Sequence, residues 1–163
     1  MSQSSVHEVA NLLQDHPIFA SLTQSELTEV AGMAEVLMVE QGDIVMQEGM
    51  DGSAFFLLQS GELRVSAGGK FLTTLRPGAC IGEMAVLDSG PRAATVTATR
   101  SSELLCFDRT RFEGLLAADS LAAHKLVFAL AKVVVQRLRS TVAQGQGPLP
   151  ADVTQSSFVM RQS

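Results

Sequence analysis

The chain has 163 residues, which is enough for one compact domain and short for two. Hydrophobic residues make up 46% of the chain and charged residues 18%, a balance that excludes a disordered protein. The formal net charge of −5 argues against a broad nucleic-acid-binding surface, because most of the surface would repel a polyanion.

The two cysteines, Cys80 and Cys106, stand in apolar stretches with no second cysteine or histidine at metal-ligand spacing. That setting is typical of buried thiols in a reducing compartment. The N-terminus lacks a basic segment followed by an apolar block, and no run reaches the roughly 18 consecutive apolar residues of a membrane span. We therefore expect a cytoplasmic protein without a membrane span.

Two short helices are predicted within residues 5–34. The first has apolar residues at helical spacing and ends at His16-Pro17, because the residue before a proline is driven out of the α region. The second begins with a capping box, Thr23-Gln24-Ser25-Glu26, and its apolar face continues to Ala34.

Residues 36–107 have the texture of an all-β block. Apolar runs of four to seven residues alternate with glycine-containing turns. Gly68-Gly69 suits a two-residue hairpin turn, and Gly61 suits a turn with a positive φ. We predict a mainly β protein with flanking helices, in which short antiparallel strands form a β-roll or jelly roll.

The helical period returns over residues 109–142, where it predicts a short helix and then a long one with a broad apolar stripe. Glycines and prolines from Gly145 to Pro150 break any helix. Residues 143–163 are therefore expected to form a polar tail after the domain of residues 1–142.

The segment with the clearest chemistry is Gly82-Glu83-Met84-Ala85, followed after a short loop by Pro91-Arg92-Ala93-Ala94-Thr95-Val96. A glycine before a helical start leaves backbone N–H groups that attract an anion, and an arginine offers a planar fork for phosphate oxygens. A glutamate beside a phosphate is repelled by it, but it can accept a hydrogen bond from a ribose hydroxyl. Phosphate and ribose together predict a nucleotide ligand.

These two motifs resemble the phosphate-binding cassette of the cyclic nucleotide-binding domain family, found in catabolite-activator-type regulators and protein kinase A regulatory subunits. The resemblance covers residues 17–142 and implies a β-roll closed by a C-terminal helix. Ile81 stands where the family usually has an aromatic residue, which keeps the position apolar.

The resemblance also implies the role of each motif residue. Arg92 would pair with the cyclic phosphate, and Glu83 would accept the ribose 2′-OH. Ala93 favours cAMP over cGMP, because a Thr or Ser at this position can bond the guanine amino group. The candidate ligand-binding residues are Gly82, Glu83, Met84, Ala85, Arg92, Ala93 and Ala94.

The family's pocket is covered by the helix after the barrel, so the resemblance implies a lid. Leu138 and Thr141 are the candidates, with the threonine reaching the adenine amino group. The equally weighted alternative is that both belong to the core or to a dimer seam. A homodimer joined along Val127, Leu130 and Val134 stays open.

No catalytic role is expected. A metal-dependent jelly-roll enzyme needs ligands inside the barrel, but His7, His16 and His124 all lie outside the β block. Too few residues follow Val142 for a DNA-binding helix-turn-helix domain. We expect a stand-alone sensor with no metal or catalytic cofactor, whose C-terminal helix relays binding to an unknown protein effector. The alternatives are a fragment of a channel or larger regulator, and a degenerate fold that acts as a protein-interaction module.

Overall fold

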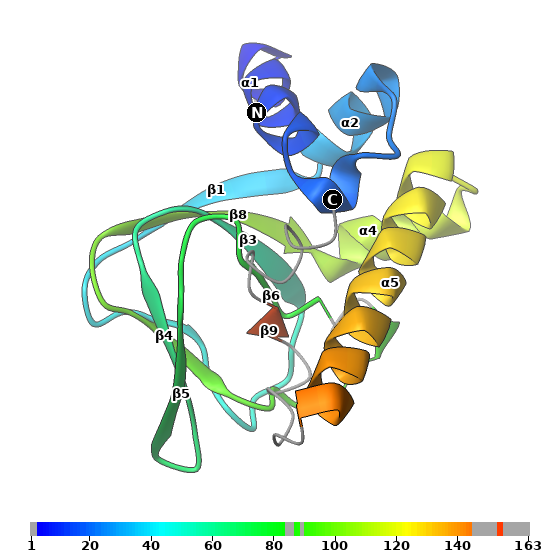
Figure 1. Ribbon diagram of the computed structural model, residues 1–163. Helices are drawn as coiled ribbons and strands as arrows, with labels where there is room; N and C mark the ends of the chain where they lie inside the picture. The colour runs from blue at the N-terminus through cyan, green and yellow to red at the C-terminus, as the bar shows by residue number, and fades with distance from the viewer. Residues whose placement is uncertain (1–2, 84–86, 89, 145–152, 155–163) are drawn as a thin grey trace.

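The computed structural model describes residues 3–83, 87–88, 90–144 and 153–154. In chain order, helices precede and follow the strand-rich region, and in space they gather on one side of it (Figure 1). Before it stand α1 (Gln3–Gln14), the single 3-10 turn η1 (Pro17–Phe19) and α2 (Gln24–Ala31); after it stand α4 (Arg109–Ala117) and α5 (Leu121–Gln144).

The strands form two antiparallel sheets. One has the order β1-β8-β3-β6-β9 and the other the order β2-β7-β4-β5. This arrangement confirms the predicted antiparallel β-roll with flanking helices and a long C-terminal helix. The strands are β1 (Ala34–Val39), β2 (Ile44–Met46), β3 (Ala54–Ser60), β4 (Leu63–Ala67), β5 (Lys70–Leu75), β6 (Cys80–Ile81), β7 (Thr95–Ala98), β8 (Ser102–Asp108) and β9 (Val153–Thr154).

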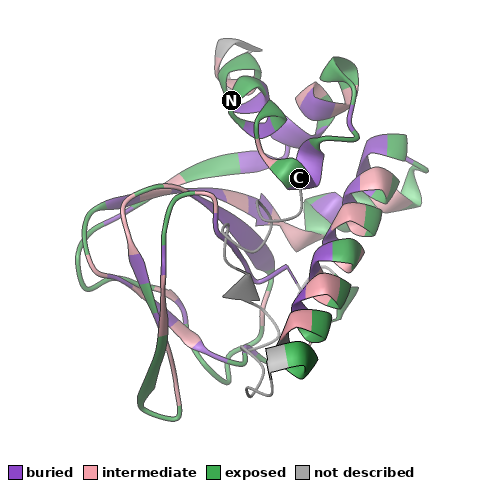
Figure 2. Cartoon of the chain, viewed as in Figure 1, coloured by how far each residue is buried: buried purple, intermediate pink, exposed green. Residues whose placement is uncertain are grey.

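Strand β3 separates two apolar cores, because successive side chains of a strand point to opposite faces. Phe55 packs with the helices, where its ring stacks on Phe107 at 4.5 Å between centroids. Phe56 belongs to the second core, which fills the space between the two sheets. The first core also takes the buried face of α5, and the opposite face of that helix is exposed (Figure 2).

Local signals in the sequence account for several element boundaries. The capping box at the start of α2 is present: Thr23 accepts a hydrogen bond from the Glu26 N–H, and Glu26 accepts one from the Thr23 N–H. Gly68 and Gly69 join β4 to β5 with φ values of 58° and 78°, as a two-residue turn with two positive φ angles requires. Gly61 has the expected positive φ, at 96°.

The structure differs from the sequence prediction at two boundaries. Ala34, which the sequence predicts to continue the second helix, is instead the first residue of β1 and pairs with Phe107. The helix α2 ends earlier, at Ala31, with Gly32 as its C-cap. The predicted tail begins inside α5, which continues to Gln144, and it contains β9, which pairs with β6. Glycines and prolines in the sequence after residue 144 disfavour a helix, but they do not exclude a strand that adds to an open sheet edge further along the chain.

Candidate functional site

Gly82 and Glu83 come directly after β6, at the point where the chain leaves the sheet. Gly82 has a φ of 77°, a conformation that side chains disfavour. This turn directs Glu83 inward, and its side chain is completely buried. A carboxylate with no exposed surface needs close polar partners to offset the loss of hydration.

Arg92 is held in place by its backbone and by its side chain. Its N–H donates to the Met50 carbonyl and its own carbonyl accepts from the Gly49 N–H, both at 2.8 Å. The buried guanidinium donates from Nη2 to the Ala54 carbonyl at 2.5 Å. Arg92 is therefore fixed against the start of β3.

Two glycines make the space that the Arg92 guanidinium occupies. A Cβ atom on Gly82 would lie 2.5 Å from Nη1 of Arg92, and one on Gly52 would lie 2.6 Å from Cζ. Real Cβ atoms do not approach non-bonded atoms this closely, so the guanidinium packs directly on the backbone of both glycines. Since Gly82 precedes Glu83, the candidate phosphate-binding cation and the candidate ribose-binding carboxylate are neighbours.

One partner of Glu83 comes from the long C-terminal helix. Nη1 of Arg137 on α5 donates to Oε1 of Glu83 at 3.1 Å, and only 10% of the Arg137 side chain is exposed. This ion pair connects α5 to the turn after β6 through two buried charges.

Arg137 is a site residue that the sequence motifs do not identify. The signal that could have found it is its place in the buried stripe of α5, since it follows Leu126, Leu130 and Val133 at helical spacing. A cation in such a stripe needs a buried partner. The sequence does not say which acidic residue that partner is, because Glu83 lies 54 positions away.

The other candidate ligand residues have different fates in the structure. Ala94 is buried beside Arg92, whereas Ala93 between them is exposed. Met84 and Ala85 lie outside the described residues. The predicted helical start at this turn therefore stays a prediction.

The two lid candidates are not brought to the site. Leu138 is 61% exposed and lies on the outer face of α5, so it does not cover Glu83 or Arg92. The side chain of Thr141 lies outside the described residues. Of the predicted dimer seam, Leu130 is fully buried in the core and Val127 packs against it, so these residues do not form an exposed face.

The buried thiol of Cys80 precedes the site. Burial raises the pKa of this thiol well above its ordinary value, and the nearby charge of Glu83 raises it further. Cys80 and Cys106 are both free cysteines. A thiol that stays protonated is a poor nucleophile and a poor metal ligand, so Cys80 acts as an apolar packing residue.

Neither a metal cluster nor a single membrane-spanning helix is present in the described ranges. No three His, Cys, Asp or Glu side chains gather there in a way that could hold a metal ion. In that same part of the chain, no single helix is both long and apolar enough to cross a membrane, although the bent pair α4 and α5 meets the criteria when taken together.

Comparison with known proteins gives consistent matches. Residues 36–119, just over half of the chain, match the family model described as "Cyclic nucleotide-binding domain". A cAMP-dependent protein kinase regulatory subunit of Hypocrea atroviridis is 34% identical over 65% of this chain and 23% of its own length. The type II regulatory subunit of Drosophila melanogaster is 31% identical over 74% of this chain and 31% of its own length. The chain thus spans between a fifth and a third of these relatives.

Solved structures give the same fold. A structure described as cAMP-bound PfPKA-R superimposes with a TM-score of 0.71 and 25% identity, over 88% of this chain and 49% of that one. The N-terminal domain of a transcriptional regulator from Streptomyces coelicolor superimposes with a TM-score of 0.66 and 28% identity, over 82% and 93%. The region matched by the family model contains β1 to α4 with Glu83 and Arg92, and the chain therefore belongs to the cyclic nucleotide-binding domain family.

Proposed function

We propose that the chain is a sensor that binds cAMP, and cGMP more weakly, and passes the binding event to a protein partner through α5. The observation that carries this proposal is the buried arrangement of Arg92 and Glu83 around Gly82. A local cation lets a protein with a net negative charge hold a cyclic phosphate, and Arg92 is a buried cation that lies against Gly82, the residue before the buried acceptor Glu83.

The proposed contacts fit the capacity of both groups. A guanidinium has five N–H donors, so Arg92 can keep its bond to the Ala54 carbonyl while it holds a phosphate. A carboxylate accepts at two oxygens from several directions, so Glu83 can bind both Arg137 and a ribose hydroxyl. Backbone N–H groups of Ala85 and Ala93 would complete the phosphate shell.

The choice of cAMP rests on two observations. Ala93 has no hydroxyl to recognise a guanine amino group. The curated relatives named above are regulatory subunits of cAMP-dependent protein kinases, and one matching structure is described as bound to cAMP. We propose binding without catalysis, because every role implied for the motif residues is a contact to the ligand. A cytoplasmic location and the absence of a nucleic-acid partner stay predictions.

The relay is proposed to act through the pair of Glu83 and Arg137. A ribose hydroxyl on Glu83 would add a further hydrogen bond to the carboxylate that already binds α5. Nucleotide binding would then favour one position of α5 over another, which is the differential contact that a two-state change requires. Leu138 is exposed in this structure. If α5 closes over the base, residues of this helix would move toward the bound nucleotide.

Isothermal titration of the whole chain with cAMP, cGMP and cyclic di-GMP tests this function. We expect the order cAMP, then cGMP, with no binding of cyclic di-GMP. Replacing Arg92 with Ala should cost on the order of 2 to 4 kcal/mol of binding free energy, because a buried charge-assisted contact is lost. The 2′-deoxy analogue of cAMP should also bind more weakly.

A milder variant separates binding from folding. Arg92→Lys keeps the charge but loses the fork, so it should fold and still bind cAMP less well than the wild type. If wild type and Arg92→Ala bind cAMP equally, the assigned site is wrong. If the folded wild type binds no cyclic nucleotide at all, the fold serves as a protein-interaction module instead.

A further inference from the structure

The outer face of α5 carries a row of large apolar side chains that the fold leaves uncovered. These side chains are between 47% and 74% exposed, although the opposite face of the same helix supplies buried residues to the core. The helix therefore has two apolar faces, and only one of them stabilises this domain. The exposed row consists of Leu121, Phe128, Val135, Leu138 and Val142.

The spacing of this row is that of a helix-pairing seam. Leu121, Phe128, Val135 and Val142 follow one another at intervals of seven residues, and Leu138 stands three after Val135. A seven-residue repeat keeps one stripe of a helix facing a partner helix. The row extends for about 32 Å at 1.5 Å per residue, so its shape suits another helix better than a compact loop.

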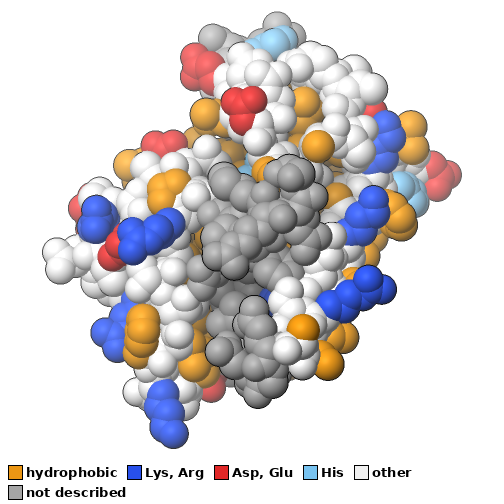
Figure 3. All heavy atoms as spheres, in the orientation of Figure 1, with side chains coloured by type: hydrophobic (Ala, Val, Ile, Leu, Met, Phe, Trp, Pro, Cys, Tyr) orange, Lys and Arg blue, Asp and Glu red, His pale blue; other side chains and the backbone are white. Residues whose placement is uncertain are grey.

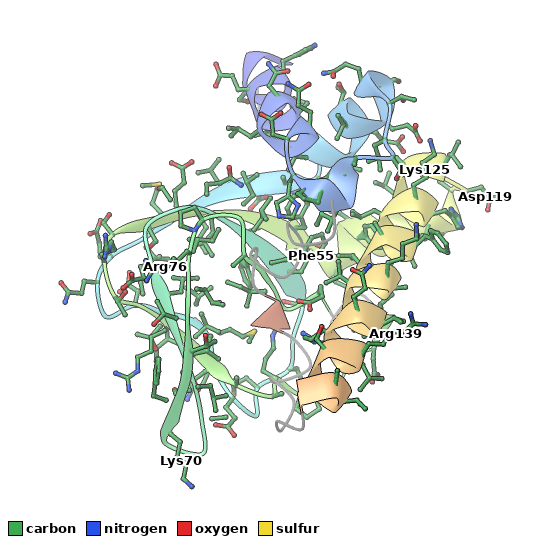
Figure 4. All side chains as sticks on the ribbon, viewed as in Figure 1. Phe55, Lys70, Arg76, Asp119, Lys125 and Arg139 are labelled. Atoms are coloured by element: carbon green, nitrogen blue, oxygen red, sulfur yellow. The ribbon has the colours of Figure 1, made fainter. Side chains whose placement is uncertain are left out.

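A row of cations runs beside the apolar row. Lys125, Lys132 and Arg139 are also seven residues apart, and α5 contains no Asp or Glu in a chain whose formal net charge is −5. Figure 3 shows Lys and Arg side chains next to apolar ones on the side of the molecule where α5 lies, and Figure 4 labels Lys125 near the start of the helix and Arg139 near its end. Glu26 bonds Lys125 at 2.8 Å, whereas Lys132 and Arg139 lie further out on the exposed surface.

A groove lies beside the N-terminal half of α5, next to the apolar row. It has a volume of about 620 Å³ between α5 and η1, with Pro17 and Ile18 on one side and Phe128 on the other. Lys125 and Lys132 line it as well, and the Lys132 ammonium lies 4.5 Å from the centroid of the Phe128 ring. A large apolar side chain of a partner can enter the groove while acidic groups of that partner meet the two lysines.

From these observations we propose that the outer face of α5 binds an amphipathic, acidic helix of a partner protein. The apolar row would pack against the apolar row of that helix, and Lys132 and Arg139 would pair with its carboxylates. Charge complementarity favours this occupant over a second copy of the chain. In a parallel pair of α5 helices the cations would face Val127 and Val134, and in an antiparallel pair they would face other cations.

This inference deepens the proposed function, since the relay through α5 needs a partner and the face just described would receive it. The two can fail separately. Phe128, Lys132 and Arg139 are exposed and none of them is a candidate ligand or lid residue, so variants at these three positions should leave cAMP binding unchanged, and cAMP titration of each variant checks this.

The test uses the whole chain and two synthetic helical peptides of three heptads. Both peptides have leucine at the core positions; the flanking positions are glutamate in one and lysine in the other. Fluorescence anisotropy of the labelled peptides measures affinity at low and at high salt. We expect the glutamate peptide to bind at least tenfold more tightly than the lysine peptide, and to lose affinity as salt screens the charges.

Variants of the outer face of α5 test whether the peptides bind there. Phe128→Ser, and the double variant Lys132→Glu with Arg139→Glu, should each weaken binding of the glutamate peptide about tenfold or more. The double variant should in turn gain affinity for the lysine peptide, which a loss of folding cannot produce. Leu72→Ser, at an exposed leucine of β5, is the matched control and should change neither affinity.

Four results would overturn the proposal. Equal binding of the two peptides would remove the charge argument, and failure of both to bind would remove the site. Co-sedimentation with vesicles of phosphatidylcholine and phosphatidylserine, without peptide binding, would assign the face to a membrane surface. A dimer in sedimentation velocity that Phe128→Ser dissociates would assign it to a second copy of the chain.

Discussion

At the scale of single residues, the candidate site depends on two glycines, because a glycine has no side chain to occupy the space that Arg92 needs. The guanidinium of Arg92 lies where the Cβ atoms of Gly52 and Gly82 would be. Gly82 also needs its φ of 77°, so it is restricted both by backbone conformation and by the space that Arg92 fills. Gly42 has a similar φ of 92°, but a Cβ atom on it would meet nothing within 4 Å.

This contrast predicts different effects for two similar substitutions. Gly42→Ala should lose roughly 1 to 2 kcal/mol of stability, since it forces a side chain into the left-handed region. Gly82→Ala should lose more than that, because its Cβ atom would also overlap the Arg92 guanidinium. Only Gly82→Ala should displace Arg92, and we expect it to weaken cAMP binding at least tenfold. Urea unfolding and calorimetric titration of both variants measure the two effects. Unchanged cAMP affinity in a folded Gly82→Ala protein would contradict the assigned contact.

At the scale of elements, features encoded within a few residues could be predicted from the sequence. The capping box of Thr23 and Glu26 and the Gly68-Gly69 hairpin each depend on neighbours in the chain, and both are confirmed. The assignment of Glu83 and Arg92 to one site comes from local motifs, through the family resemblance, and stays a prediction. The structure adds that the Arg92 guanidinium lies against Gly82, which the sequence predicted only as the glycine before a helical start.

Features that depend on distant parts of the chain were not predicted. The pair of Glu83 with Arg137 joins positions 54 residues apart, and the position of Leu138 on the outer face depends on the rotation of α5 about its axis. The pairing of β9 with β6 likewise joins the end of the chain to its middle. A periodic stripe defines the faces of a helix, but the tertiary packing decides what each face meets.

The turn that begins η1 provides a pH-dependent contribution to stability. Nε2 of His16 donates to the Gly78 carbonyl at 2.8 Å, and Nδ1 accepts from the Ile18 N–H. Only the bond from Ile18 requires the neutral ring, because a protonated ring still donates from Nε2 but can no longer accept at Nδ1. Burial lowers the pKa of His16 below its ordinary value, and the bond to Gly78 offsets part of this effect.

The sign of the pH effect follows from this lowered pKa. The unfolded chain takes up a proton at His16 near pH 6.5, whereas the folded protein takes it up only at a lower pH. The contribution of the neutral ring is therefore fully present above about pH 6.5 and is lost as the pH falls toward the folded pKa. Chemical unfolding from pH 7.5 to pH 5 should show a steeper loss of stability in the wild type than in His16→Asn. Both proteins keep His7 and His124, so equal slopes would show that His16 does not contribute.

At the scale of the whole molecule, α5 connects the candidate nucleotide site with the proposed partner-binding face. Its inner face packs on η1 and α2 within the first core, and Arg137 reaches the turn after β6. Its outer face carries the apolar and basic rows. α5 is attached to the site by the ion pair of Arg137 with Glu83 and to the rest of the domain by its apolar face. Such a helix can shift as a unit when a ligand changes the interactions of Glu83.

The proposed relay from Glu83 through Arg137 to α5 predicts a specific result for Arg137→Gln. Removing one member of a buried ion pair leaves Glu83 with less compensation and should destabilise the fold by about 3 to 5 kcal/mol at most. In the wild type, cAMP should add hydrogen-exchange protection to residues 126–142. In Arg137→Gln the added protection on α5 should fall sharply while cAMP still binds the barrel, because Arg92 is unaffected.

Arg139→Gln is the matched control for this prediction. Arg139 lies two residues further along the same helix but is exposed, so its loss should leave both the stability and the exchange response to cAMP close to wild type. Exchange measured with saturating cAMP on the three proteins separates the two positions. If α5 gains the same protection in Arg137→Gln as in the wild type, the signal does not pass through Glu83, and the packing of α5 in the first core would have to carry it instead.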